Sequence, residues 1–166
     1  MYKMVIDRES LLSVMIEINR RLQKQRKRGE IILYNDTAMS FTRVWNEPFS
    51  TIEARCYPFQ TIKEMFKEEG FKEVFSSEIH VHRAKHENIQ KYKEFSNLKI
   101  YVALTEYILA MKIKMARCED LRKIEYLLKE TNIETEAELE KIVYRYYQPN
   151  QIDERMIGEV AYRFLK

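Results

Sequence analysis

The stretch that decides the fold is TEYILAMKIKMARCEDLRKIEYLLKE, residues 105–130. From residue 107 to residue 116, apolar side chains cover almost every side of a helical wheel, which predicts a buried central helix. Lys112 interrupts this surface between Ile108 and Ala116, where a solvated lysine is not expected. The pattern therefore predicts a charged group inside the fold.

The second half of the stretch predicts an amphipathic covering helix. Its apolar residues form a single stripe, with charged residues beside it. The stripe consists of Leu121, Ile124, Leu127 and Leu128. The two helices meet at a corner that carries Lys112, Arg117 and Asp120, where Arg117 and Asp120 are candidates for an ion pair of small energetic value if exposed.

This stretch resembles the C-terminal signature of a bacterial nucleotidyltransferase-fold family. The family is related to the abortive-infection and toxin–antitoxin nucleotidyltransferases of the polymerase-beta-like superfamily. The matching residues are Glu106, Tyr107, Leu109, Ala110, Met111, Lys112, Ala116, Arg117, Asp120, Leu121, Ile124, Leu127 and Leu128. The family's next features, an acidic short helix, a tyrosine-rich end and a final helix, have counterparts in residues 134–147 and 152–165.

The rest of the chain alternates helical and strand patterns. Expected helices cover residues 8–28, with Gly29 as the stop, then 38–45 and 61–69; expected strands cover 30–34, 50–57 and 98–103, with a strand-like end to 74–81 and a polar connection over 85–95. This order predicts an α+β fold with a small mixed sheet packed by helices, as the resemblance also implies. We expect a nucleotidyltransferase-like core at 1–104 and a helical part at 105–166, forming one compact unit.

The composition of the chain limits the class of protein and the cellular compartment that we expect. The 166 residues are 45% apolar, enough for a core, and no apolar run is long enough to cross a membrane. The N-terminus has no apolar signal core, and Cys56 and Cys118 form no C-x-x-C pair, so we expect a reduced, cytoplasmic protein. The net charge of +3 does not by itself imply nucleic acid.

The resemblance implies two catalytic motifs in the first half of the chain. The family pattern is G-G-x-A-M after the first strand, where glycines admit the triphosphate, and then T-x-D-I-D-A, whose acids hold Mg²⁺. This chain has NDTAM at residues 35–39 and STIEA at 50–54. Asn35 and Asp36 replace the glycines, and only Glu53 matches an acid. A third acid has no clear position, and Glu78 is a guess.

These departures favour a degenerate member that keeps the scaffold without nucleotidyl transfer. We expect it to act through a protein partner or self-association, in a defence or toxin–antitoxin-type setting, with no cofactor. The alternative is an active enzyme that moves a nucleotide from NTP to RNA or protein. In that case Asp36 and Glu53 would be catalytic and hold Mg²⁺, and the NTP would contact Thr37, Lys112 and Arg117. In the first interpretation Lys112 instead pairs with an acid such as Glu53 or Asp36.

A basic cluster lies at the expected end of the first helix. It consists of Arg20, Arg21, Lys24, Arg26, Lys27 and Arg28. Such a cluster can contact phosphate backbones, which makes an RNA-binding module a further alternative. It is also typical of a solvated helix end, where cations stabilise the last carbonyls. No aromatic residue is interleaved in this stretch as a platform for a base.

Two further groups allow more than one interpretation. His80, His82 and His86 lie close together and are either a zinc site or a solvated histidine cluster. The C-terminal segment is rich in aromatic residues, which either form an exposed patch for a partner or pack the last helices onto the core. These residues are Tyr144, Tyr146, Tyr147, Tyr162 and Phe164.

Overall fold

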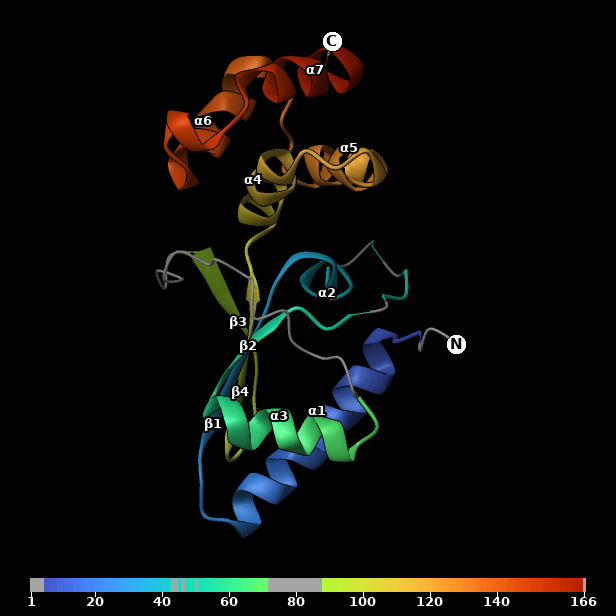
Figure 1. The fold of residues 1–166 in the computed structure, drawn as a ribbon, viewed down its shortest axis with the longest axis vertical. Coiled ribbons are helices and arrows are strands. Elements are labelled where there is room, and N and C mark those ends of the chain that lie inside the picture. Colours follow the sequence, from blue (N-terminus) through green and yellow to red (C-terminus); the bar gives the residue numbers. More distant parts are fainter. Residues whose placement is uncertain (1–4, 43–44, 46, 50, 72–87, 166) are drawn as a thin grey trace. The chain divides into compact units, whose positions relative to one another are not determined.

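A computed structural model describes residues 5–42, 45, 47–49, 51–71 and 88–165. The chain divides into two compact units, Met1–Ala103 and Leu104–Lys166. The described residues form helices and a four-stranded mixed sheet, which confirms the predicted α+β class (Figure 1). The expected segment 74–81 lies outside the described residues.

The first unit is built on the sheet. Its strands lie in the order β2-β1-β4-β3. Their bounds are β1 Gly29–Leu33, β2 Ala54–Tyr57, β3 Ile89–Glu94 and β4 Leu98–Ala103. The central pair, β1 and β4, is parallel, and the outer strands β2 and β3 run antiparallel to their neighbours. The sheet is therefore mixed.

One face of this sheet is apolar and covered by two helices, α1 (Arg8–Lys24) and α3 (Phe59–Glu68) (Figure 1). Strand register aligns buried side chains in rows across this face. The rows are Cys56, Ile31 and Ile100, and next to them Ala54, Leu33 and Val102. Within the segment 50–57 that was expected to be a strand, the alternate residues Ile52, Ala54 and Cys56 are all buried. The opposite face carries the polar residues of the same strands.

The first helix ends earlier than expected, at Lys24 and not at residue 28. Arg26 adopts a left-handed conformation with φ 54° and ends the helix in a Schellman turn. Its amide donates to the carbonyl of Gln23 at 3.0 Å, and the amide of Lys27 donates to the carbonyl of Leu22 at 2.9 Å. Arginine thus occupies the position that sequence analysis assigned to Gly29, which instead begins β1.

Two other boundaries differ from expectation. The helix expected to begin at residue 38 begins at residue 35, as the short helix α2 (Asn35–Met39), because left-handed Asn35 lets the chain turn directly from β1 into the helix. The second strand begins at Ala54 and not at residue 50. The residues before it are held by side chains of α2 instead of by a neighbouring strand, as described below.

The largest error concerns residues 85–95, expected to be a polar connection. Residues Ile89–Glu94 form β3, an edge strand whose residues after Ile89 are all exposed. An edge strand that buries no face shows no apolar alternation, so its sequence lacks the signal used to predict strands. A register shift between Lys91 and Lys93 interrupts the pairing further.

The second unit contains four α-helices. They are α4 Thr105–Met115, α5 Leu121–Glu130, α6 Glu136–Tyr146 and α7 Glu154–Phe164. The buried central helix is confirmed, with Lys112 fully buried in α4, and Ile124, Leu127 and Leu128 are buried along the predicted stripe of α5. The capping box formed by Thr135 and Glu138 is also present.

Candidate functional site

The candidate site in the first unit begins at Asn35, directly after β1. Asn35 has a φ of 47° and is 2% exposed. A left-handed backbone at this position is easiest for glycine and tolerated by asparagine. The chain thus makes a tight left-handed turn here without a glycine, and a buried amide side chain lies beside the backbone.

The side chain of Asn35 binds Glu53. Its Nδ2 lies 3.1 Å from Oε1 and 3.0 Å from Oε2 of Glu53, so both carboxylate oxygens accept hydrogen bonds from one amide nitrogen. Hydrogen bonds to a charged acceptor are stronger than neutral ones. The only acid that matches the family's metal-binding motif is therefore bound by an amide donor of its own fold.

Thr37 holds the chain before β2 against α2. Its hydroxyl accepts from the amide of Glu53 at 2.8 Å and donates to the carbonyl of Thr51 at 3.2 Å. The Thr37 side chain is fully buried, and the amide of Tyr34 donates to the carbonyl of Glu53 at 2.8 Å. These bonds fix the backbone on both sides of Glu53, while Asp36 is half-buried and Thr51 exposed.

These residues do not fit the Mg²⁺ and nucleotide that the resemblance implies. Within the described ranges, no three His, Cys, Asp or Glu side chains come together as a metal site. A metal ion at Glu53 would have to displace the amide of Asn35, because that amide contacts both carboxylate oxygens. The helix that would face a triphosphate is five residues long and carries Asp36 in its first turn.

Lys112 and Arg117, expected at the same site, belong to the second unit. There the ammonium of Lys112 donates to Oδ1 of Asp120 at 2.9 Å, and both side chains are almost completely buried. Lys123 also approaches Oδ1 of Asp120, at 3.6 Å. The expected pairing of Arg117 with Asp120 is therefore wrong: Arg117 is exposed and lies 3.9 Å from Glu119, a contact of little energetic value.

The corner between α4 and α5, predicted to carry Lys112 and Asp120 together, holds these two side chains as a buried charge pair within the second unit. The left-handed Ala116, with φ 52°, ends α4 and turns the chain toward Asp120, which precedes α5. The other carboxylate oxygen of Asp120, Oδ2, is buried without a hydrogen bond in the described part of the chain. Removing one partner of such a buried pair leaves the other charge buried without compensation, which destabilises the fold.

The basic cluster separates into two groups in the structure. Arg21 forms ion pairs with Glu17 of its own helix and with Glu68 and Glu69 at the end of α3, so it joins the two helices. Arg20 lies 3.4 Å from Glu17. The remaining cations are exposed, and no described carboxylate lies within ion-pair distance of them. They are Lys24, Arg26, Lys27 and Arg28.

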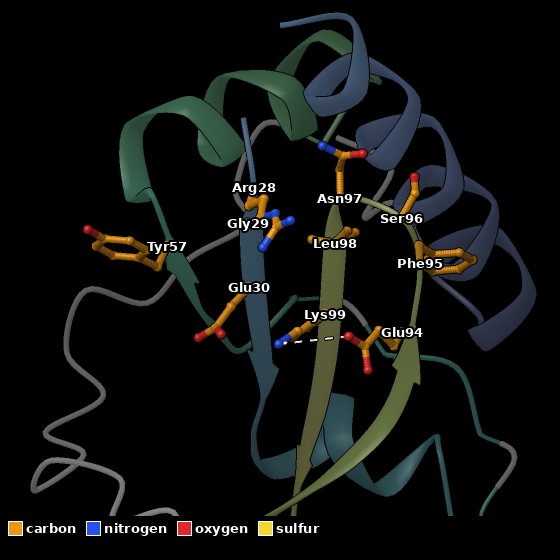
Figure 2. A pocket seen from close by; sticks show the side chains of 10 residues that line it. All are labelled: Arg28, Gly29, Glu30, Tyr57, Glu94, Phe95, Ser96, Asn97, Leu98 and Lys99. Atoms are coloured by element: carbon orange, nitrogen blue, oxygen red, sulfur yellow. Dashed lines mark ion pairs between the residues drawn. The ribbon is translucent and has the colours of Figure 1, made fainter. Parts of the chain in front are cut away.

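A pocket of about 410 Å³ lies beside this second group, where strands β1 and β4 begin (Figure 2). Arg28 lines it together with Tyr57 from the end of β2 and Phe95 from the turn after β3. Sequence analysis found no aromatic residue among the basic ones, because the sheet brings Tyr57 and Phe95 there from distant positions. Strand order is the only signal that could have revealed this group, and β3 was not predicted.

The aromatic residues of the second unit divide between packing and exposure. The ring of Tyr107 lies 5.1 Å from that of Tyr146 and 6.4 Å from that of Tyr147 between centroids, whereas Tyr162 is 90% exposed. Burial raises the pKa of Tyr147 and, more weakly, that of Tyr107. Packing is thus the role of the residues near Tyr107. The histidines at 80, 82 and 86 lie outside the described residues.

Comparison of the chain with protein-family models, with curated proteins and with solved structures found no match. In the described residues, no helix has both the length and the apolar character needed to cross a membrane.

Proposed function

We propose that this protein is a nucleotidyltransferase-like scaffold that does not transfer nucleotides and acts by binding. It would work through a protein partner or a second copy of itself, in a defence or toxin–antitoxin-type setting. The proposal rests on the resemblance of residues 105–130 to that family and on the contacts at the equivalent of its catalytic motif.

The observation that carries the proposal is the pair of hydrogen bonds from Asn35 to Glu53. In an active enzyme of this type, the acid would hold Mg²⁺ and the residue at position 35 would be glycine. Here the asparagine supplies the amide that contacts the acid. Asparagine in place of glycine at position 35 and threonine in place of an acid at position 51 both lower the affinity of this site for a metal ion.

A transfer assay tests the enzymatic half of the proposal. The purified protein is incubated with each of the four NTPs labelled at the α-phosphate, with Mg²⁺ or Mn²⁺, in the presence of total RNA. We expect no label in RNA or in protein. Incorporation of label that Glu53→Ala abolishes would contradict the proposal.

The binding half is tested by expressing the chain together with the proteins encoded beside it. We expect one of these proteins to co-elute in a fixed stoichiometry, or the chain to elute as a defined oligomer by light scattering. A monomer with no such partner would contradict this half without affecting the other.

One observation favours the active enzyme as the second candidate. Oδ1 of Asn35 is buried and has no hydrogen-bond partner in the described part of the chain. A rotation of the amide by 180° would replace its nitrogen by this oxygen, a metal-compatible donor, next to Glu53. Mg²⁺-dependent protection of the protein from heat would support this candidate.

A further inference from the structure

The face of the sheet opposite α1 and α3 presents exposed polar and aromatic side chains. Register places Tyr57 opposite Glu30, Glu30 opposite Lys99, and Lys99 opposite Glu94, in one row across all four strands (Figure 2). At about 4.8 Å per strand, this row spans about 14 Å. We call the following residues the open sheet face: Glu30, Arg55, Tyr57, Lys91, Glu94 and Lys99.

Tyr57 offers this face a stacking surface. Its side chain is 73% exposed, and it belongs to the edge strand β2. Phe95 lines the far side of the same pocket (Figure 2). Lys93, whose ammonium lies 5.1 Å from the ring centroid of Phe95, pairs with Ile100 and so does not belong to the open sheet face. An exposed ring beside cations is the arrangement on which nucleic-acid bases stack.

Cations border the pocket on the side of β1. Arg28 lines the pocket directly, and it is preceded by Lys24, the exposed last residue of α1, and by Arg26 and Lys27 in an exposed loop. Asn97 holds this loop, since its Nδ2 donates to the carbonyl of Lys27 at 2.8 Å and its carbonyl accepts from the amide of Gly29 at 2.8 Å. The backbone that carries these cations is therefore held in place by hydrogen bonds to Asn97.

The acids of the open sheet face do not cancel this charge. Glu94 is paired with Lys91 at 2.7 Å and with Lys99 at 3.8 Å. These pairs lower the pKa of Glu94, mainly through Lys91, and the two ammonium groups offset the charge of its carboxylate. Glu30 is the remaining acid, against Arg28, Arg55 and the loop cations. The surface thus keeps an excess of positive charge beside an exposed ring.

We propose that the open sheet face and its basic border bind single-stranded nucleic acid. The cations would contact successive phosphates, and a base would stack on Tyr57. A duplex would use the cations but not the ring, because its bases are already stacked. The inference goes beyond the proposed function. The two sites lie at opposite ends of β1, whose five residues span about 16 Å, so each can fail alone.

Fluorescence anisotropy with the full chain tests this. The probes are a labelled 12-nucleotide single-stranded RNA of mixed sequence, the same sequence as DNA, and the duplex, each titrated from about 20 to 200 mM salt. We expect both single strands to bind more tightly than the duplex and to weaken with salt. Tyr57→Ala should weaken single-strand binding about 5- to 150-fold, and Tyr57→Phe should restore it.

Matched controls separate this site from general attraction by a basic protein. Arg28→Glu with Arg55→Glu should weaken binding about tenfold or more, whereas Lys141→Glu with Arg155→Glu, an equal change of charge in the second unit, should not. Tyr162→Ala, which removes a ring that is even more exposed than that of Tyr57, should have no effect. The proposal would be overturned if no binding occurred at low salt or if the duplex bound as tightly as the single strands. It would also be overturned if Tyr57→Ala left the affinity unchanged or if the two charge-reversal pairs weakened binding equally.

Discussion

Asn35 combines a left-handed turn of the backbone with a side chain that makes hydrogen bonds. Its left-handed backbone preserves the path of the chain, while its amide supplies hydrogen bonds to Glu53 that glycine does not have. Asn35 therefore contributes to the fold through its left-handed backbone and through its side-chain hydrogen bonds, and mutations can separate these two contributions.

We expect Asn35→Ala to destabilise the protein more than Asn35→Gly. Both lose the bonds to the carboxylate, which contribute about 1.5 kcal/mol here because Glu53 is only half-buried. Alanine adds about 1 kcal/mol of strain in the left-handed region, which glycine avoids. The free energy of unfolding in urea measures the difference. Equal values for the two variants would show that the backbone of residue 35 is not strained.

The buried pair of Lys112 and Asp120 makes a second prediction at this scale. Asp120→Ala removes the carboxylate to which the buried ammonium donates, and should cost about 3 kcal/mol of unfolding free energy. The double variant Lys112→Met, Asp120→Ala should recover part of this loss, since an apolar side chain tolerates the site. Additive losses in the double-mutant cycle would mean that the two side chains are not coupled.

Among the elements, two glycines should respond in opposite ways to the same substitution. A Cβ at Gly29 of β1 would lie 2.9 Å from Cδ1 of Ile62 and 3.2 Å from the carbonyl oxygen of Tyr57, so Gly29→Ala should cost about 1–3 kcal/mol. Gly158 lies within helix α7, where a Cβ meets nothing closer than 3.7 Å. Gly158→Ala should therefore stabilise by about 0.5–1 kcal/mol.

Thermal denaturation of the two variants, measured in parallel, checks this pair. A raised melting temperature for Gly29→Ala would mean that the close approach of α1 and α3 to β1 is not as described. A lowered one for Gly158→Ala would mean that α7 does not form a regular helix at that position.

The tyrosine cluster of the second unit should make the protein sensitive to alkali. Burial raises the pKa of Tyr147 in the folded state, so the protonated phenol is favoured there. In the unfolded state the phenol ionises near pH 10, and the unfolded chain then binds fewer protons than the folded one. Stability from this group is therefore complete below about pH 10 and is lost as the pH rises above it.

Urea denaturation between pH 8 and 11.5 tests this prediction. The loss of stability above about pH 10 should be smaller in Tyr147→Phe, which cannot ionise, than in the wild type. Tyr162→Phe is the matched control, because that side chain is 90% exposed and should leave the profile unchanged. An identical slope in Tyr147→Phe would exclude this phenol as the cause.

Across the whole molecule, the sequence predicts what depends on a strong apolar period. The helices α1, α3 and α5 and the strands β1 and β4 each bury a distinct face, the helix α4 is buried on almost every side, and all were anticipated in type. The strand β3 was not, since it buries almost nothing, and the true end of α1 was not, since arginine took the position typical of glycine.

For the candidate sites, too, the sequence predicts local features but not contacts between residues that are distant in the chain. That the two family motifs depart from their pattern is visible from single residues. Two contacts depend instead on which elements the fold brings together: that of Asn35 with Glu53, and the pocket that Tyr57 shares with Arg28. No spacing in the sequence carries that information.

The central claim is that Glu53 is bound by Asn35 in place of a metal ion and nucleotide. Thermal melting with each NTP at millimolar concentration, with and without Mg²⁺, tests it most directly, because a ligand of the folded state raises the melting temperature. The triple variant Asn35→Gly, Asp36→Gly, Thr51→Asp, which restores the family pattern, is measured beside the wild type. We predict no Mg²⁺-dependent shift for the wild type and a shift for the restored variant. A Mg²⁺-dependent shift of the wild type that Glu53→Ala removes would contradict the claim.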